Sequence, residues 1–204
     1  MYLMGYQIIL GVIATIIGVV CFIPYFNGII KKSVKPHAFS WLIWGIIQTT
    51  VFFAQISKGG GAGAWRNGVG AILILTIFVI AIFRGEKEIT KLDKICLISA
   101  LFGIVLWLIT TNPVWGVIIV SGADAIGYLP TMRKSYKNPY QESATIFGLS
   151  AISLFISLFA LGSINITTVL YPISIGIADT LLVILIVAKR RMIKVGKSTK
   201  SKKK

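Results

Sequence analysis

A chain of 204 residues that is 56% hydrophobic and only 13% charged has too few polar residues for the surface of a soluble globular domain. Its formal net charge of +15 lies in the connections between apolar stretches and at the C-terminus. We interpret this charge as the topology signal of a membrane protein with a basic tail, and not as a nucleic-acid-binding surface.

Seven apolar, almost uncharged stretches follow one another along the chain, each near the roughly 20 residues that a helix needs to cross a membrane. The expected spans cover residues 3–26, 38–57, 64–83, 95–110, 113–132, 144–161 and 166–188. Their apolar residues are continuous rather than alternating, which favours helices over a β-barrel. The sequence therefore predicts an all-α integral membrane protein with seven transmembrane helices.

The basic residues orient these spans. With the spans drawn as above, 19 of the 21 Lys and Arg residues fall on one side, and only Lys58 and Arg66 fall on the other. Because cytoplasmic loops carry the excess of Lys and Arg, we expect the N-terminus outside and the C-terminus in the cytoplasm of a cell, most simply a prokaryotic one. Residues 193–204 are rich in Lys and Ser, so we expect a disordered tail that attracts anionic lipids.

The chain also resembles itself when it is shifted by 106 residues without a gap. Spans one to three then fall on spans five to seven, with Pro24 on Pro130, Gly70 on Gly176 and Arg84 on Arg190. A single helix between two three-helix units gives both units the same orientation. The predicted organisation is 3+1+3, with one triple-helix repeat in 1–91, a linker helix in 92–111 and a second, parallel repeat in 112–192.

Polar residues within the spans are the candidates for function. Asp124 in span five and Asp179 in span seven lie at similar depth near the middle of the membrane, where an ionisable residue is functional by default. Two adjacent carboxyls can share a proton, so we expect a proton- or cation-coupling site, with acids that are protonated or hydrogen-bonded to neighbouring helices as the alternative. Asn67, between Trp65 and the Gly-rich stretch that follows, aligns with the segment after Tyr171. An amide beside aromatic rings suits a polyhydroxylated solute.

Prolines inside the spans are candidate hinges, because proline removes a backbone donor and kinks a helix. Pro24 and Pro130 occupy equivalent positions in the two repeats, and Pro172 has Arg66 as its counterpart. The alternative is a static kink, which is common in membrane helices.

A family resemblance rests on short motifs spread over most of the chain. These are Phe22-Ile23-Pro24, Asn67-Gly68-Val69-Gly70, Tyr128-Leu129-Pro130 and Pro172 followed by Gly176. With the repeat pattern, they make the chain similar to the SWEET and SemiSWEET sugar transporters of the PQ-loop group. In that family a Gln usually follows the first Pro, where this chain has Tyr25, and an Asn usually stands where this chain has Ile173.

The resemblance implies transport of a small polar solute, a sugar first of all, by alternating access and without a cofactor or metal. It implies substrate contacts at Asn67 and at the position of Ile173, pocket or gate roles for Trp65 and Tyr171, and hinges at the prolines. A seven-helix sensor or receptor and a non-transporting membrane scaffold remain alternatives, and self-association stays open. An enzyme is not expected, since one His and two isolated Cys give neither a zinc site nor a nucleophile–base pair.

Overall fold

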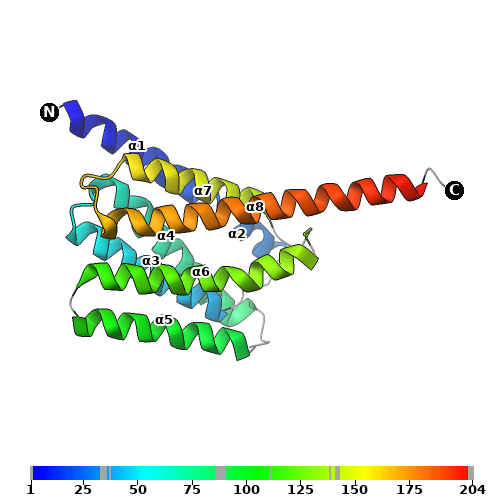
Figure 1. Cartoon of the computed structure of the whole chain (residues 1–204), viewed down its shortest axis with the longest axis horizontal. Coiled ribbons are helices and arrows are strands. Elements are labelled where there is room, and N and C mark those ends of the chain that lie inside the picture. Colours follow the sequence, from blue (N-terminus) through cyan, green and yellow to red (C-terminus); the bar gives the residue numbers. More distant parts are fainter. Residues whose placement is uncertain are drawn as a thin grey trace.

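The computed structural model is an all-α bundle with its long helices side by side (Figure 1). The structure describes residues 2–32, 36, 38–85, 91–110, 112–137, 139–140 and 143–201. Its helices are α1 (Tyr2–Val20), α2 (Ile23–Ile30), α3 (Ala38–Ser57), η1 (a 3-10 helix, Gly61–Ala64), α4 (Trp65–Arg84), α5 (Lys91–Thr110), α6 (Pro113–Lys137), α7 (Ala144–Phe159) and α8 (Ile166–Ser201).

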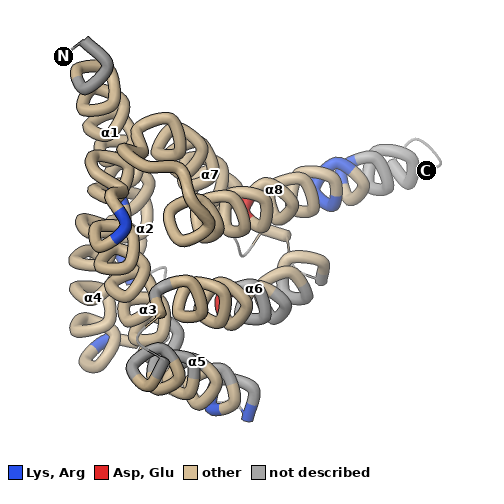
Figure 2. Tube along the Cα trace, turned by 60° about the vertical axis from the view of Figure 1, so that its left-hand side comes forward, with Lys and Arg blue, Asp and Glu red and all other residues tan. Residues whose placement is uncertain are grey.

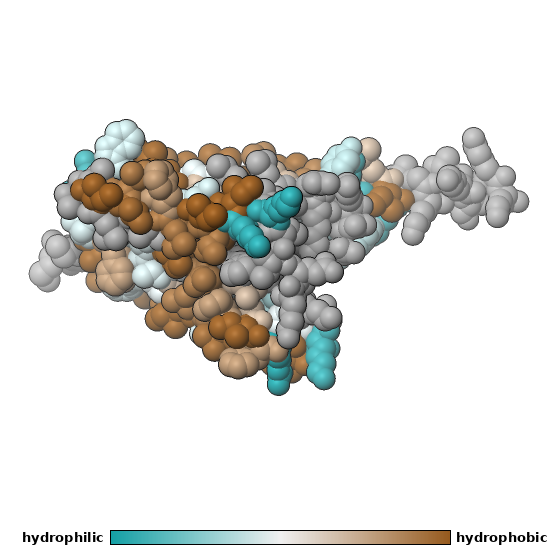
Figure 3. Space-filling model, turned by 90° about the horizontal axis from the view of Figure 1, so that it is seen from below, coloured by the Kyte–Doolittle hydropathy of each residue, from teal (hydrophilic) through white to brown (hydrophobic). Residues whose placement is uncertain are grey.

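Several of these helices have the length and composition of membrane spans. Among the described residues, three helical stretches are long and apolar enough to cross a membrane: Gly5–Ile30, Gly61–Arg84 and Ile166–Lys194. Shorter apolar helices accompany them. Large apolar side chains are exposed along the flanks, for example Ile98, Phe102 and Ile109 on α5, and brown side chains cover much of the described flank in Figure 3. Exposed apolar surface of this kind marks a membrane or protein contact.

Local sequence explains where several helices begin and break. The Asn112 Oδ1 accepts a hydrogen bond from the Val114 N–H at 3.0 Å, which caps the start of α6 at Pro113. The first predicted span is two helices rather than one, because α1 ends at Val20 and α2 begins at Ile23 with Pro24 in its first turn. Proline has no N–H to continue the helix, and it is well suited to a first turn.

The helices pack in the same order in both halves of the chain. In the first half α4 packs against both α1 and α3, and in the second half α8 packs against both α6 and α7. The halves meet where α1 packs on α7 and α3 packs on α6, and α5 lies against α6 and α3. A core cluster fills the junction of α3, α6, α7 and α8, with Ile47, Val51, Val120, Leu154 and Tyr171 among its buried residues.

Two segments outside the expected spans contain helix in the structure. The Gly-rich connection after Lys58 contains η1, whose Ala64 is fully buried, and η1 packs against α1, α3 and α7. Glycines at 59 and 61 with positive φ allow this tight path. The expected disordered tail is helical in its described part, because α8 continues to Ser201. Lys and Arg are good helix formers, so the span's helix can extend into the basic segment. Residues 202–204 lie outside the described residues.

Candidate functional site: a buried polar cluster

Arg66, which the sequence places with Lys58 on the outer side of the spans, is buried in the structure. It lies in the first turn of α4 and is only 7% exposed. Its Nε donates to the Ser153 Oγ at 3.1 Å and its Nη2 to the Ser150 Oγ at 2.9 Å, both on α7. The guanidinium therefore joins the first half of the chain to the second through neutral oxygen acceptors.

A glycine of α1 makes room for the Arg66 side chain. A Cβ placed on Gly18 would lie 3.2 Å from the Arg66 Cγ and 3.1 Å from the Ser153 Oγ. Contacts this short leave little room for a larger residue. The Ser153 hydroxyl donates in turn to the Ala14 carbonyl at 2.7 Å, so α1, α4 and α7 are tied together around Arg66.

A relay of side-chain amides leads from Arg66 to the turn of α8 that contains Pro172. The Arg66 Nη1 donates to the Asn67 Oδ1 at 3.1 Å, and the Asn67 Nδ2 donates to the Gln55 Oε1 at 2.8 Å. The Gln55 Nε2 donates to the Thr168 carbonyl at 2.7 Å. That carbonyl lies four residues before Pro172, which has no N–H to offer it. Gln55 thus supplies the hydrogen bond that the proline removes.

This relay changes the expected role of Asn67. Its side chain is completely buried, and both ends of its amide are engaged within the protein. Because its side chain is completely buried, Asn67 can contact a solute only after the bundle opens around it. Gln55 was not among the candidates drawn from the sequence.

The two acids are both buried in the same region, as their equal depth predicts. Asp124 is 4% exposed on α6 and Asp179 is 1% exposed on α8. Figure 2 marks acidic positions in red within these two helices. The Asp179 Oδ1 accepts a hydrogen bond of 2.6 Å from the Tyr128 hydroxyl. Hydrogen-bonding side chains of Tyr171 and Trp44 lie beside the Asp124 carboxyl.

Each acid also keeps one oxygen without a partner. The Oδ1 of Asp124 and the Oδ2 of Asp179 are buried and accept no hydrogen bond within the described part of the chain. Asp179 and Arg66 both act electrostatically on Asp124, and Ser150 is a hydrogen-bonding neighbour of both Asp179 and Arg66. We call this group the polar cluster; its members are Gln55, Arg66, Asn67, Asp124, Tyr128, Ser150, Ser153, Tyr171 and Asp179.

Two of the predicted contact residues lie outside the polar cluster. Trp65 is 39% exposed and lines a surface hollow with Val12, Thr15, Ile16 and Val69. Ile173 is also 39% exposed, on the outward face of α8 with Ile177 and Leu181. Tyr171, in contrast, is buried beside Asp124.

The prolines behave differently from one another. Pro24 follows the break between α1 and α2. The side chain of Pro130 is not described, but α6 continues through its position. Pro172 lies inside α8 and is bridged by Gln55 as above. The equivalent positions 24 and 130 therefore do not have equivalent backbones.

At one end of the bundle, hydrogen bonds cross between the two halves. This is the end that carries the N-terminus in Figure 1. The Gln7 Nε2 donates to the Leu161 carbonyl at 2.8 Å, and the Gly162 N–H donates to the Gly60 carbonyl at 3.2 Å. The Asn165 Nδ2 donates to the Lys58 carbonyl at 3.2 Å. We call these bonds, together with the Gln55–Thr168 bond, the outer closure.

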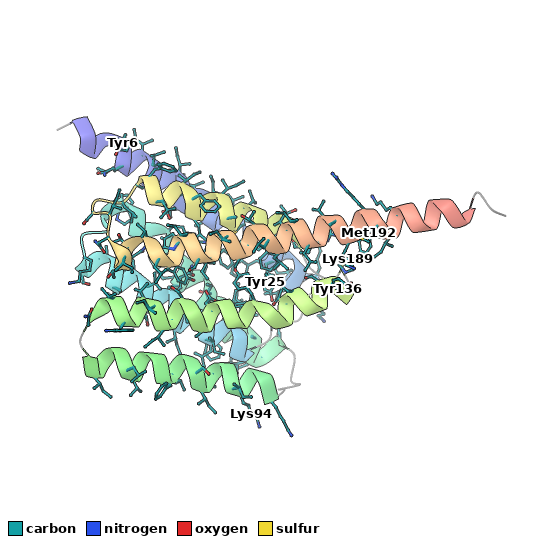
Figure 4. The ribbon with its side chains drawn as sticks, in the orientation of Figure 1. Tyr6, Tyr25, Lys94, Tyr136, Lys189 and Met192 are labelled. Atoms are coloured by element: carbon teal, nitrogen blue, oxygen red, sulfur yellow. The ribbon has the colours of Figure 1, made fainter. Side chains whose placement is uncertain are left out.

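The opposite end has described contacts of another kind. The Lys189 Nζ lies 3.3 Å from the centroid of the Tyr136 ring, joining α8 to α6 (Figure 4). The Arg190 Nε donates to the Pro139 carbonyl at 3.0 Å. A hydrogen bond from Lys189 lowers the pKa of the exposed Tyr136 hydroxyl. These contacts stay within the second half of the chain.

No group of three or more metal-binding side chains occurs among the described residues. Comparison with protein-family models, with curated proteins and with solved structures finds no match to this chain.

Proposed function

We propose that the protein is a membrane transporter that moves a small polar solute by alternating access between two three-helix units. In this proposal α1–α4 and α6–α8 are the two parallel repeats and α5 is the linker of a 3+1+3 arrangement. The shared packing order supports it, since α4 and α8 each lie between the other two helices of their unit. The contacts between units support it too. In the overlay of the repeats α1 corresponds to α6 and α3 corresponds to α7, so the contact of α1 with α7 is matched by the contact of α6 with α3.

The polar cluster is the observation that carries the proposal. One Arg and two Asp side chains are buried where the flanks of the bundle are apolar. By insertion scales an ionised Asp costs about 2.5–3.5 kcal/mol in the middle of a membrane helix, so the two buried acids mark a solute or ion pathway more readily than a structural anchor. A scaffold protein without transport does not require buried charges, because apolar residues of similar volume would pack as well.

The outer closure supports the alternating-access part. Its hydrogen bonds all join the first unit to the second, whereas the described contacts at the opposite end, Lys189 with Tyr136 and Arg190 with Pro139, join helices of one unit. This arrangement is expected of a transporter closed on the N-terminal side. Opening that side would break the Gln55–Thr168 bond and uncover the Asn67 amide, whose second N–H and second oxygen lone pair would then contact the solute.

The orientation follows the positive-inside rule. Lys31, Arg84 and Lys94 lie at helix ends, and Lys189 follows the expected span within α8; their side of the proposed membrane would be the cytoplasmic side of a cell membrane. The basic residues of α8 beyond Lys189 would attract anionic lipids there. Sugars are the first solutes to test, because side-chain amides and tyrosines suit hydroxyl groups.

Counterflow in proteoliposomes tests the proposal. The wild type, Asn67→Ala and the exposed control Asn27→Ala would be loaded with each member of a panel of sugars and amino acids, and uptake of the same labelled solute measured. We expect saturable exchange of a solute in the wild type and in Asn27→Ala, with loss in Asn67→Ala. A wild type that is monodisperse and reconstituted, yet exchanges no member of the panel, would overturn the proposal.

A further inference from the structure

Three ionisable side chains from three different helices share the interior of the bundle. Arg66 comes from α4, Asp124 from α6 and Asp179 from α8, and each is less than a tenth exposed. Electrostatic interactions link Asp124 to both of the others, and Arg66 also acts on Asp179. The hydrogen bonds of Arg66 go to Ser150, Ser153 and Asn67, so the guanidinium is not paired directly with either carboxyl.

The balance of charge sets how many protons such a group holds. Arg stays charged in proteins, and a buried uncompensated charge is strongly disfavoured. Two ionised carboxylates would leave a net charge of −1, and two neutral carboxyls would leave +1. One proton shared between two carboxyls leaves the group neutral. The other titratable side chains that face the group are Cys21, Tyr128 and Tyr171. These are a thiol and two phenols, which ionise above neutral pH in ordinary surroundings, so they do not alter the count.

The hydrogen bonds indicate which acid is ionised. Asp179 accepts the 2.6 Å bond from Tyr128, a length typical of a hydroxyl that donates to a carboxylate. Ser150, which accepts a hydrogen bond from Arg66, also lies beside Asp179. Asp124 and Asp179 each have one buried oxygen without a partner, so the Tyr128 bond is what distinguishes them: it favours Asp179 as the ionised acid and leaves Asp124 to hold the proton.

We propose that Arg66, Asp124 and Asp179 form a single-proton site, with Asp179 as the counter-ion of Arg66 and Asp124 as the carrier of one exchangeable proton. Its use to couple solute movement to a proton gradient rests on the proposed transport function. Release of the proton from Asp124 leaves a net charge of −1, which opposes closure of the apolar bundle around the group. Binding restores neutrality and allows the units to move.

The test counts protonated buried carboxyls by their infrared C=O stretch in the purified protein at neutral pH, so it needs no solute. We expect one such carboxyl per chain in the wild type and none in Asp124→Asn. Charge balance also predicts none in Asp179→Asn, because Asp124 then becomes the counter-ion of Arg66. Arg66→Gln should show two, and the charge-preserving control Arg66→Lys should show one.

Several outcomes would overturn the single-proton site. A wild type with no protonated carboxyl does so, and so does a signal that Asp179→Asn leaves intact, because the acids then ionise independently. An equal number of protonated carboxyls in Arg66→Gln and Arg66→Lys would also overturn it, because the charge at position 66 would then not set the number of protons. Each variant is first checked for a monodisperse profile, and the near-isosteric Asn variants keep the test usable if Arg66→Gln does not fold. If the proton count contradicts the single-proton site, the counterflow result is unaffected. If counterflow fails, the proton count remains valid.

Discussion

Gln55 supplies a hydrogen bond that Pro172 removes from α8, and replacing Gln55 should reveal how much this bond stabilises the fold. Gln55→Leu removes the donor to the Thr168 carbonyl and the acceptor for the Asn67 Nδ2, and it leaves two buried polar groups without partners. An orphaned buried group costs about 1–3 kcal/mol, while hydrogen bonds measured between membrane helices average roughly 0.6 kcal/mol. We therefore expect Gln55→Leu to lower the free energy of unfolding by about 1–4 kcal/mol.

A second substitution makes the reasoning specific. Pro172→Ala returns an N–H to α8 that can bond the Thr168 carbonyl directly, four residues earlier. In this background Gln55→Leu leaves only the Asn67 amide unpaired, so its cost should fall by roughly half. The coupling between the two positions should then be about 0.5–2 kcal/mol, in the range seen for residues that share a network.

The assay is reversible unfolding in mixed micelles, followed by labelling of Cys21, whose thiol is 2% exposed in the folded protein. The four proteins of the cycle are the wild type, the two single variants and the double variant. Effects that add within about 0.3–0.5 kcal/mol would refute the claim that Gln55 caps the carbonyl freed by Pro172.

Two further predictions concern the ends of the bundle. A Cβ on Gly63 would lie 2.7 Å from the Ser157 carbonyl oxygen, so Gly63→Val should destabilise the fold by about 1–3 kcal/mol. The control Gly122→Ala, which has open space around it, should not. Equal melting temperatures of the two variants would contradict the packing of η1. The pKa of Tyr136 is lowered by Lys189, so ultraviolet titration with Tyr136→Phe as the reference should show it rise in Lys189→Ala. Because the folded-state pKa of Tyr136 is lowered, the stability that the tyrosinate gains from Lys189 is present above the unfolded-state pKa and is lost as the pH falls through the folded-state pKa. An unchanged titration in Lys189→Ala would contradict the contact.

The sequence predicts the helices well where a span is bounded by strong local signals. The expected span 38–57 coincides with α3, and the span 144–161 ends two residues after α7. Similar distances from the basic ends of their expected spans also predict that Asp124 and Asp179 lie at similar depth, and both are buried in the structure. The break after Val20 is visible in the sequence only as Pro24, which marks a kink or a break but does not distinguish the two.

The interactions of Arg66 and Gln55 could not be read from the chain. Arg66 follows a Gly-rich stretch, and its acceptors Ser150 and Ser153 lie more than 80 residues away on α7. The spacing of these two serines places both on one helix face, and Gly18 stands where the second repeat has Asp124. These features indicate that the two serines and Gly18 lie beside another helix, but they do not identify Arg66 as the residue that they contact. The burial of η1 depends likewise on contacts with α7 that no local pattern encodes.

The central claim is that the two units move against each other to carry a solute, and a cross-link through the outer closure tests it most directly. A Cβ on Gly59 would lie 3.2 Å from the Ser163 Cβ, close to the roughly 3.5–4.5 Å of a disulfide. Gly59→Cys, which carries roughly 1–2 kcal/mol of strain because Gly59 has a positive φ, would be combined with Ser163→Cys in a background in which Cys21 and Cys96 are Ala, and counterflow measured before and after oxidation. We expect oxidation to stop exchange and reduction to restore it, with each single-Cys control unaffected. Exchange at the same rate in the oxidised and reduced double variant would contradict alternating access.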